Sequence, residues 1–513
     1  MAAVFGQIAT PHMDWLGLAP HMVMAGGAVL LLTIVSLAGR RLPAWFAGAW
    51  TVATSLAVIG LGFALWMRFD HGAWAPYEAS DDGGLLTAAG AIGVGRFAVF
   101  VIVLLAAVVV LTVLVADDFL RREKLDGPAV YVLLMLSAAG GMTMSAANNL
   151  IVMFLGLEIL SLAVYVLVAM HLRRSSSQEA GIKYFVLGAF ASAFFLYGIA
   201  LIYGGTGSLN LTEISLLLTE SSTGAATVDK GLFYVGMAML LVGFGFKVAA
   251  VPFHAWTPDV YQGAPSPVVV YMAAGVKAAG FAALTRVFMA AFVQHYDDWQ
   301  PAVFGLAVAS LAVGSLMGIV QGDIKRILAY SSISHAGFIL VGMHGALGRG
   351  LASVMFYLAA YAAMAIGSFA VVTVVSGPGD ENTDIASLRG LAVRRPMLAG
   401  AFTLLLLSQA GIPFTVGFWA KFEVISAAAD NSFFELTVIA MLATVVAAFL
   451  YLRIVVVMYL DPPDADTPRL QVSVGPATAI AIVVLFTLAF GIYPEPLLNL
   501  ADDAFSAMNL ITQ

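Results

Sequence analysis

Residues 243–268 read GFGFKVAAVPFHAWTPDVYQGAPSPV, a stretch in which a lysine interrupts an apolar segment that glycine and proline break up. Lys247 lies well inside the apolar run, and Pro252 follows five residues later. Proline removes a backbone donor and kinks a helix. A span interrupted in this way beside an ionisable residue is typical of a discontinuous membrane helix that lines a wet cavity, although an ordinary proline kink has the same pattern.

The composition of the whole chain indicates that lipid surrounds this stretch. Of 513 residues, 61% are hydrophobic and 10% are charged, and 50 more are glycine. Soluble domains have about 45–50% apolar residues with glycine included, and about 25% charged ones. The chain has too few polar side chains to cover a surface that faces water, which excludes a soluble enzyme, a nucleic-acid binder and a disordered scaffold. Because cysteine is absent, disulfides, cysteine-ligated zinc and iron–sulfur clusters on this chain are also excluded.

The apolar segments predict an all-α membrane protein. A bilayer requires about 20 apolar residues per helix, and runs such as 99–115 lack the alternation of a membrane β-barrel. No Lys or Arg precedes the first segment, so we expect a permanent span rather than a cleaved signal peptide. Fourteen segments qualify: 17–38, 44–69, 91–116, 128–147, 149–172, 181–206, 232–256, 265–292, 301–320, 324–345, 351–376, 397–429, 433–459 and 473–498. The division at 147–149 is the weakest, and 397–429 is too long for a straight helix.

Basic residues predict the orientation of these spans, because Lys and Arg gather on the cytoplasmic side. Fourteen fall on one side, four on the other and five inside spans, which predicts that both termini lie outside the cytoplasm. The larger set comprises Arg40, Arg41, Arg121, Arg122, Lys124, Arg173, Arg174, Lys183, Lys325, Arg326, Arg389, Arg394, Arg395 and Arg469. The smaller set comprises Arg68, Arg96, Lys230 and Arg349.

Four charged residues lie deep inside predicted spans: Glu158, Lys247, Lys277 and Lys421. Each would cost about 2.5–3.5 kcal/mol at a helix centre, so each must be paired or hydrated. Static ion pairs between helices are one explanation. Three lysines and one acid do not neutralise each other, which favours a proton or ion relay. We hypothesise that Glu158 pairs with Lys247 and that changes in this pair switch the lysine between charged and neutral states.

Two interrupted spans suggest an internal repeat. Each of these spans contains a proline near its lysine: Pro252 follows Lys247, and Pro413 precedes Lys421. The two spans are five helices apart. An odd number of helices per unit reverses the orientation, which predicts the inverted repeat common in transporters. The predicted divisions are an N-terminal three-helix segment 1–127, five-helix units 128–292 and 301–460, and a C-terminal helix segment 470–513.

Histidines add two candidates to the relay. His335 falls opposite Glu158 in the repeat and can titrate near neutral pH, and His254 adjoins the first break. Packing histidines are the alternative for both. Arg453 lies near a helix end, where snorkelling explains it, whereas the roles of Arg286 and Glu423 stay open.

At these residues the chain resembles a known family. After Lys247 the chain carries the motif PFHxWxPDVYxGAPxPV. This motif is similar to the signature of antiporter-like subunits of proton-pumping NADH:quinone oxidoreductase (complex I), and its sequence resembles that of subunit N. The Glu158 helix, the block 322–335 and the block 411–422 fit as well. The resemblance covers nearly the whole chain.

The resemblance implies proton translocation driven by electron transfer from NADH to quinone in other subunits of a bacterial plasma-membrane complex. Glu158 and Lys247 match the pair of the cytoplasmic half-channel, Lys277 the relay between halves, and Lys421 the exit side. It also implies no cofactor or metal on this chain, with FMN, iron–sulfur clusters and quinone in partner subunits. A subunit of a multisubunit Na+/H+ antiporter and a proton-coupled solute transporter are the alternatives.

Overall fold

A computed structural model describes residues 13–38, 41–70, 85–125, 127–345, 349–380, 382–463 and 470–509 as a bundle of helices. Thirteen helices in these ranges are long and apolar enough to cross a membrane, and a fourteenth predicted span is divided into two shorter helices. The helical fold class is thereby confirmed. Arg40 and Arg469, most of the connection between the predicted spans 44–69 and 91–116, and both chain termini lie outside the described residues.

The N-terminal segment consists of three long helices and a hairpin. The elements are α1 (Trp15–Ala38), α2 (Phe46–Asp70), β1 (Leu85–Thr87), β2 (Ile92–Val94) and α3 (Arg96–Arg122). The predicted helix start at residue 91 is wrong, because residues 92–94 pair antiparallel with β1 across a turn whose residues Ala88, Ala89 and Gly90 all have positive φ. Helix α3 then continues past its predicted end, where Asp117 and Arg121 form an ion pair one turn apart.

The next five predicted spans form a first unit. They are α4 (Pro128–Ala146), α5 (Leu150–Val168), α6 (Ser175–Thr206), α8 (Lys230–Val248) with the short α9 (Trp256–Gly263), and a continuous helix 266–291. That last helix contains α10 (Ser266–Tyr271), a π-helical segment Met272–Val276, α11 (Lys277–Arg286) and a second π-helical segment Val287–Ala291. Residues 208–230, which connect two of the predicted spans, contain α7 (Leu211–Thr223), and Asn210 caps this helix at its N-terminus.

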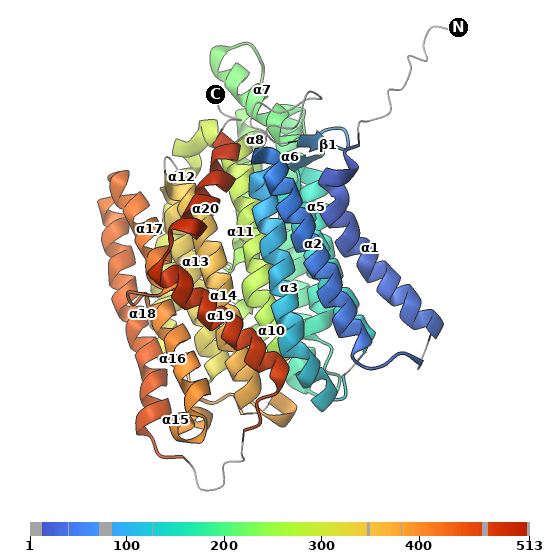
Figure 1. Ribbon diagram of the computed structural model, residues 1–513. Helices are drawn as coiled ribbons and strands as arrows, with labels where there is room; N and C mark the ends of the chain where they lie inside the picture. The colour runs from blue at the N-terminus through green and yellow to red at the C-terminus, as the bar shows by residue number, and fades with distance from the viewer. Residues whose placement is uncertain are drawn as a thin grey trace.

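The second unit and the C-terminal segment follow. The unit comprises α12 (Tyr296–Ile319), α13 (Ile324–His344), α14 (Leu351–Val375), the short α15 (Leu391–Arg394), α16 (Pro396–Ala410), α17 (Val416–Asp430) and α18 (Phe434–Leu460). Helix α19 (Val474–Ile492) crosses the face of the bundle and leads into α20 (Glu495–Asn509), so the predicted last span ends six residues early and a separate amphipathic helix follows it (Figure 1).

Two matching backbone bridges reveal the inverted repeat. The N-cap of α5, Asn149, bridges to Asn210, and the N-cap of α13, Asp323, bridges to Asp384. Both residues of the second bridge lie 174 positions after their counterparts in the first. The first bridge lies at the end of the bundle with the hairpin and α7, and the second at the end with α15 (Figure 1). Corresponding helices therefore run in opposite directions.

Close helix pairs inside each unit depend on small residues. A Cβ at Gly140 of α4 would lie 2.5 Å from the backbone nitrogen of Leu160 in α5. At Gly314 of α12 a Cβ would lie 2.4 Å from the backbone nitrogen of Ser334 in α13. Glycines that let helix backbones approach in this way are typical of membrane helix packing.

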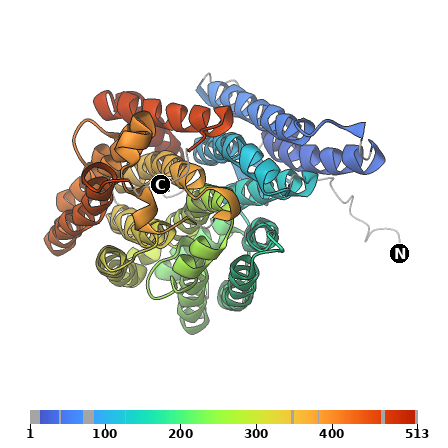
Figure 2. The ribbon, with the colours of Figure 1, turned by 90° about the horizontal axis from the view of Figure 1, so that it is seen from below.

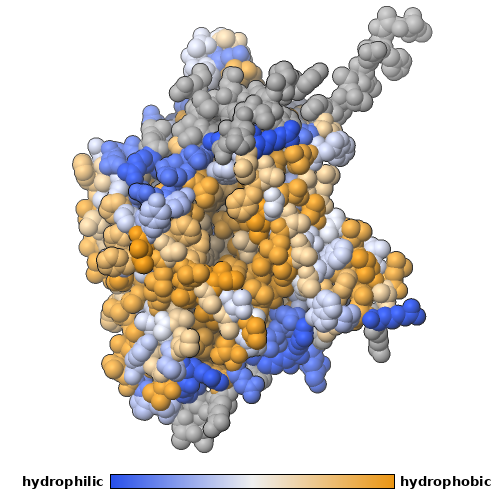
Figure 3. Space-filling view, viewed as in Figure 1, coloured by the Kyte–Doolittle hydropathy of each residue, from blue (hydrophilic) through white to orange (hydrophobic). Residues whose placement is uncertain are grey.

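Different helices form the interior and the surface of the bundle. The helix 266–291, α13 and α14 have wholly buried apolar stretches and form the centre, whereas α1 and α2 lie at one edge (Figure 2). On the face seen in Figure 3, apolar side chains form a broad band with hydrophilic residues at both ends of the bundle. These central helices are therefore shielded from lipid, and charges buried along them must be stabilised by neighbouring groups in the interior.

Candidate functional site

Lys247 lies in the last turn of α8, where the helix stops. Ala249 has a positive φ of 60° and ends the helix, and the peptide bond before Pro252 is cis. The chain turns without helical structure until Trp256 begins α9, and the backbone N–H of Val251 donates to Ser310 Oγ at 2.9 Å. The predicted break is therefore present, and it leaves the Lys247 side chain only 4% exposed.

Lys247 has a hydroxyl partner rather than a carboxylate. Its Nζ donates to Ser161 Oγ at 2.8 Å, and the hydroxyl of Ser161 donates in turn to the carbonyl oxygen of Leu157. Glu158 accepts instead from the hydroxyl of Ser192 in α6. The predicted Glu158–Lys247 ion pair is thus wrong as a direct contact: the glutamate side chain is turned toward α6, although its charge still acts on the lysine.

Lys277 lies at the point where the first π-helical segment returns to an α-helix. Single π-helical turns inside α-helices are frequent at functional sites. The Nζ donates to the carbonyl oxygen and to the Oγ of Ser332, both at 2.5 Å, and lies 5.5 Å from the centre of the Tyr361 ring. This lysine therefore links the first unit directly to α13 and α14 of the second.

His335 lies one turn along α13 from Ser332 and is completely enclosed. Its Nδ1 lies 2.7 Å from the hydroxyl of Tyr357 and its Nε2 3.2 Å from that of Tyr451. The Tyr451 hydroxyl also contacts Ser331 Oγ at 2.6 Å. The 174-residue spacing makes Ser332, rather than His335, the counterpart of Glu158. The predicted position of His335 in the repeat is therefore displaced by one helical turn.

Lys421 lies in α17, beyond the second break. Gly411, with a φ of 91°, ends α16, and a Cβ there would lie 3.0 Å from Lys421 Cδ. The Nζ donates to the carbonyl oxygen of Ala410 at 3.1 Å and lies 4.6 Å from the centre of the Phe338 ring. Lys421 is also 174 positions after Lys247. Ser332, which contacts Lys277, and Phe338, which contacts Lys421, lie on either side of His335 along α13.

Lys247, Lys277, His335 and Lys421 form a row of buried basic residues, and His254 and Arg286 lie outside it. His254 lies in the first break, and its buried Nδ1 has no hydrogen-bond partner within the described ranges. Arg286 donates to the carbonyl oxygens of Ala147, Ser145 and Gly93, so it fastens the hairpin and the end of α4 to α11.

Two further charged residues, Arg453 and Glu423, have partners outside their own helices. Arg453 donates to the carbonyl oxygens of Ile319 and Gln321 and so closes the end of α12. Glu423, which is buried, accepts from Arg349 at 2.8 Å. Neither residue contacts Lys421 or His335 through any interaction found in the described part of the chain.

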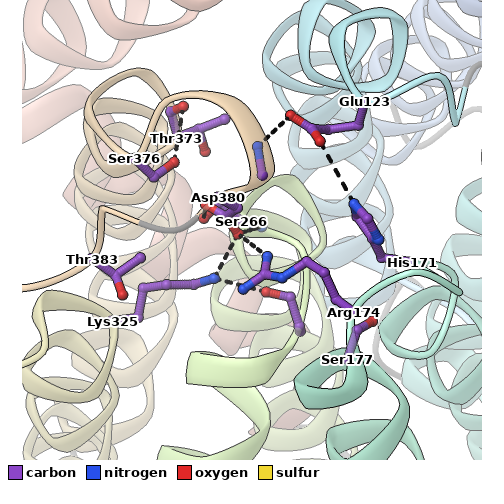
Figure 4. A network of polar contacts seen from close by, with 12 residues as sticks. Glu123, His171, Arg174, Ser177, Ser266, Lys325, Thr373, Ser376, Asp380 and Thr383 are labelled. Carbon is purple, nitrogen blue, oxygen red and sulfur yellow. Dashed lines mark hydrogen bonds and ion pairs between the residues drawn. The ribbon is translucent and has the colours of Figure 1, made fainter. Parts of the chain in front are cut away.

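A buried charge cluster around Asp380 escaped the sequence analysis. Asp380 lies in the turn after α14, accepts from Lys325 Nζ at 2.8 Å and Arg174 Nη1 at 3.3 Å, and receives both the backbone N–H and the hydroxyl of Ser266 (Figure 4). Next to it, Glu123 accepts from the N–H of Gly379. No sequence pattern indicated this cluster, because Asp380 lies in an irregular glycine-rich turn.

The cluster joins three parts of the chain at one end of the bundle. Asp380 satisfies the first N–H of the helix that carries Lys277, and it also pairs with the first turn of α13. Burial alone would raise the pKa of the Asp380 carboxyl, but the Lys325 charge and the hydrogen bonds from Lys325 and Ser266 together hold this pKa below its usual value. Arg174, Lys325 and Arg122, all predicted on one side, meet here.

A cleft of about 610 Å³ opens beside this cluster. Its walls include Ala180 and Lys183 of α6, Asp259 of α9, and Asp380. Asp259 pairs with Lys183 at 2.9 Å and with Arg326 at 2.7 Å. Burial acts to raise the pKa of Asp259, but hydrogen bonds from Arg326 and Lys183 lower it below its usual value.

An inverted repeat with two broken helices and a central row of buried basic residues defines an antiporter-like membrane subunit. The family model described as NADH:quinone oxidoreductase/Mrp antiporter matches residues 147–447. NADH-quinone oxidoreductase subunit N of Acidothermus cellulolyticus is 46% identical over 377 residues, which are 73% of this chain and 72% of the relative. Subunit N 3 of Streptomyces griseus is 39% identical over 531 aligned positions, covering 98% and 96%.

A solved structure agrees with these relatives. A chain of respiratory complex I from Thermus thermophilus, determined with bound aureothin, superimposes with a TM-score of 0.76 at 32% identity, and the match covers 94% of this chain and 98% of that one. The chain belongs to the subunit N family of NADH-quinone oxidoreductase.

Proposed function

We propose that this chain is a proton-translocating membrane subunit of an NADH:quinone oxidoreductase, with Glu158, Lys247, Lys277, His335 and Lys421 as its proton relay. The single observation that supports a relay is the kind of partner these residues have. Lys247, Lys277 and Lys421 each donate to a hydroxyl or carbonyl oxygen, and in the described ranges none has a carboxylate within ion-pair distance. A static ion pair that holds two parts of the chain together would instead resemble the direct contact between Lys325 and Asp380.

Neutral oxygen partners suit a group that must lose and regain its proton. A carboxylate at 2.8 Å would hold the ammonium charged, whereas a serine hydroxyl can accept from the charged lysine and donate to the neutral one. Lys277 and His335 would carry protons from the first unit to the second. Lys421, at the second break, would pass them toward the opposite surface, and His254 would assist at the first break.

The energy source lies outside this chain. Electron transfer from NADH to quinone would take place in partner subunits that hold FMN, iron–sulfur clusters and the quinone, and neighbouring membrane subunits would pass the electrostatic change to Glu158. We further propose that the end with Asp380 faces the cytoplasm of a bacterium, because most Lys and Arg gather there. In this orientation both termini lie on the other side. Residues 128–292 and 301–460 would act as two half-units.

The test compares two lysines of one helix in the assembled complex. Lys247→Met should abolish or cripple NADH-driven proton pumping in membrane vesicles, because the amine that takes up protons is gone. Lys230→Met, at the exposed first residue of the same helix, should pump as the wild type does. NADH–ferricyanide activity checks assembly. Normal pumping by Lys247→Met would overturn the relay, and sodium/proton exchange by the purified chain without redox centres would favour the antiporter alternative.

A further inference from the structure

Asp380 holds the ends of two helices that belong to different units of the repeat. Its Oδ2 accepts the first backbone N–H of the helix 266–291, from Ser266, at 3.0 Å, and its Oδ1 accepts the Ser266 hydroxyl at 2.6 Å. The same carboxylate accepts from Nζ of Lys325, in the first turn of α13, at 2.8 Å. All three side chains are buried, so one carboxylate fastens both helix ends at a single point (Figure 4).

The same two helices meet again deeper in the bundle, at Lys277 and Ser332. Lys277 lies eleven residues after Ser266, which is about 16 Å along its helix. Ser332 lies seven residues after Lys325, which is about 10 Å along α13. A helical side chain leans toward the N-terminus of its own helix, so the lysine reaches back to the serine. In the described ranges this contact is the only hydrogen bond between the two helices.

The contact between Lys277 and Ser332 tolerates little sliding of the helices. A proton passes between two groups only when their heavy atoms lie within about 2.6–3.2 Å or share one water. A misplacement of about 1 Å can lower a rate about 100-fold. That is less than the rise of one helical residue, about 1.5 Å. A helix end released from Asp380 could therefore shift far enough to break the contact.

The first unit has no such anchor at the equivalent place. The 174-residue spacing of the repeat makes Thr206 the counterpart of Asp380. It also makes the uncharged Ile151 the counterpart of Lys325. The Thr206 hydroxyl donates to the carbonyl oxygen of Ile202 in its own helix. A unit of this fold thus forms without a charged anchor, which indicates that the anchor serves the contact between the units.

We propose that Asp380 is a positioning residue for proton transfer between the two units, because it fixes the depth of Lys277 relative to Ser332. This inference rests on the proposed function and names a residue that acts on the same relay through two others. Lys325 and Ser266 engage both oxygens of the carboxylate, so its part in the transfer is geometric.

The first experiment removes the anchor without leaving a buried charge unpaired. Asp380→Leu with Lys325→Met takes away both charges, and Arg174, which lines the cleft, retains water as a partner. A second variant, Asp380→Asn with Lys325→Met, keeps an oxygen that can accept the Ser266 N–H. In the assembled complex we expect NADH-driven pumping, normalised to NADH–ferricyanide activity, to fall several-fold in the first variant. The second should recover at least half of that loss.

A double-mutant cycle shows whether the loss passes through the contact between the units. Ser332→Ala is introduced into the wild type and into Asp380→Leu with Lys325→Met. If the anchor positions this contact, Ser332→Ala lowers pumping by a much smaller factor once the anchor is gone. A purely structural defect would leave that factor unchanged, and this result would overturn the proposal. Normal pumping by the first variant, or no recovery in Asp380→Asn with Lys325→Met, would overturn it as well.

A milder variant keeps the test decisive if the double variants do not assemble. Ser266→Ala removes the hydroxyl that donates to Asp380 and preserves the ion pair. Ser177→Ala is the matched control, because Ser177 is a buried serine at the same end whose hydroxyl donates to Val168. Ser266→Ala should lower pumping, and Ser177→Ala should match the wild type; equal rates for the two contradict the positioning role. If Lys277→Met also pumps normally, the proposed function fails; if it does not, only the positioning role fails.

Discussion

Lys277 and Ser332 join the two units of the inverted repeat at the centre of the bundle. The Nζ of Lys277, at the start of α11, donates to both the carbonyl oxygen and the Oγ of Ser332 in α13 at 2.5 Å. His335 follows one turn later in α13 and is subject to the charges of both Lys277 and Lys421. This contact is where protons would pass from one unit to the other.

The contact predicts a graded response to substitution. Lys277→Met removes the amine and should abolish most NADH-driven pumping. Ser332→Ala removes one of the two acceptors and leaves the carbonyl, so we expect an intermediate pumping rate. Pumping by inverted membrane vesicles, normalised to NADH–ferricyanide activity, measures both. Equal rates for Ser332→Ala and Lys277→Met, or a normal rate for Lys277→Met, would contradict the graded order.

The buried ion pair of Asp380 and Lys325 predicts a large effect on stability. Both side chains are wholly buried, so Asp380→Ala leaves the lysine charge uncompensated at a cost of about 3–5 kcal/mol. Asp461→Ala is the control, because its pair with Arg389 at 3.5 Å is exposed and contributes about 0–1 kcal/mol. Thermal inactivation of the detergent-purified complex ranks the two. A double variant, Asp380→Leu with Lys325→Met, should regain much of the stability lost, because neither charge remains.

The same carboxyl predicts a dependence of stability on pH. The folded-state pKa of Asp380 is lowered: burial acts to raise it, but the charge of Lys325 and the hydrogen bonds to the carboxylate together outweigh burial. Its contribution is therefore present above the unfolded pKa of about 3.9 and is lost as the pH falls through the lower folded value. The wild type should unfold faster as the pH is reduced toward 4 and below, and Asp380→Asn should show a flatter profile over that range. Identical profiles would remove Asp380 as a source of acid sensitivity.

Two glycines of one helix predict opposite outcomes of the same substitution. A Cβ at Gly314 of α12 would lie 2.4 Å from a backbone nitrogen of α13, so Gly314→Ala must push the helices apart, at a cost of about 1–3 kcal/mol. A Cβ at Gly305 meets nothing within 4 Å, and Ala favours a helix over Gly by about 1 kcal/mol. Thermal inactivation should therefore speed up for Gly314→Ala and stay equal or slow down for Gly305→Ala.

Several features of the site could be predicted from the chain alone. Both broken helices were predicted, because proline and glycine beside a lysine disturb a helix locally. The depth of Lys247, Lys277 and Lys421 followed from their distance to the ends of the apolar runs, and all three are at most 4% exposed. The start of α3 was missed, since hairpin pairing between residues 85–87 and 92–94 is stabilised by a partner strand rather than by local periodicity.

The sequence by itself determined that this chain is a bundle of membrane helices with an inverted repeat, since hydropathy and helix-breaking residues act over short distances. Only the tertiary structure decided the partners of the charges. Lys247 contacts Ser161 rather than Glu158. Asp380 forms ion pairs with Lys325 and Arg174, which lie in distant parts of the sequence. A side-chain contact at 2.8 Å depends on helix rotation, tilt and packing, and these arise from the fit of the whole bundle.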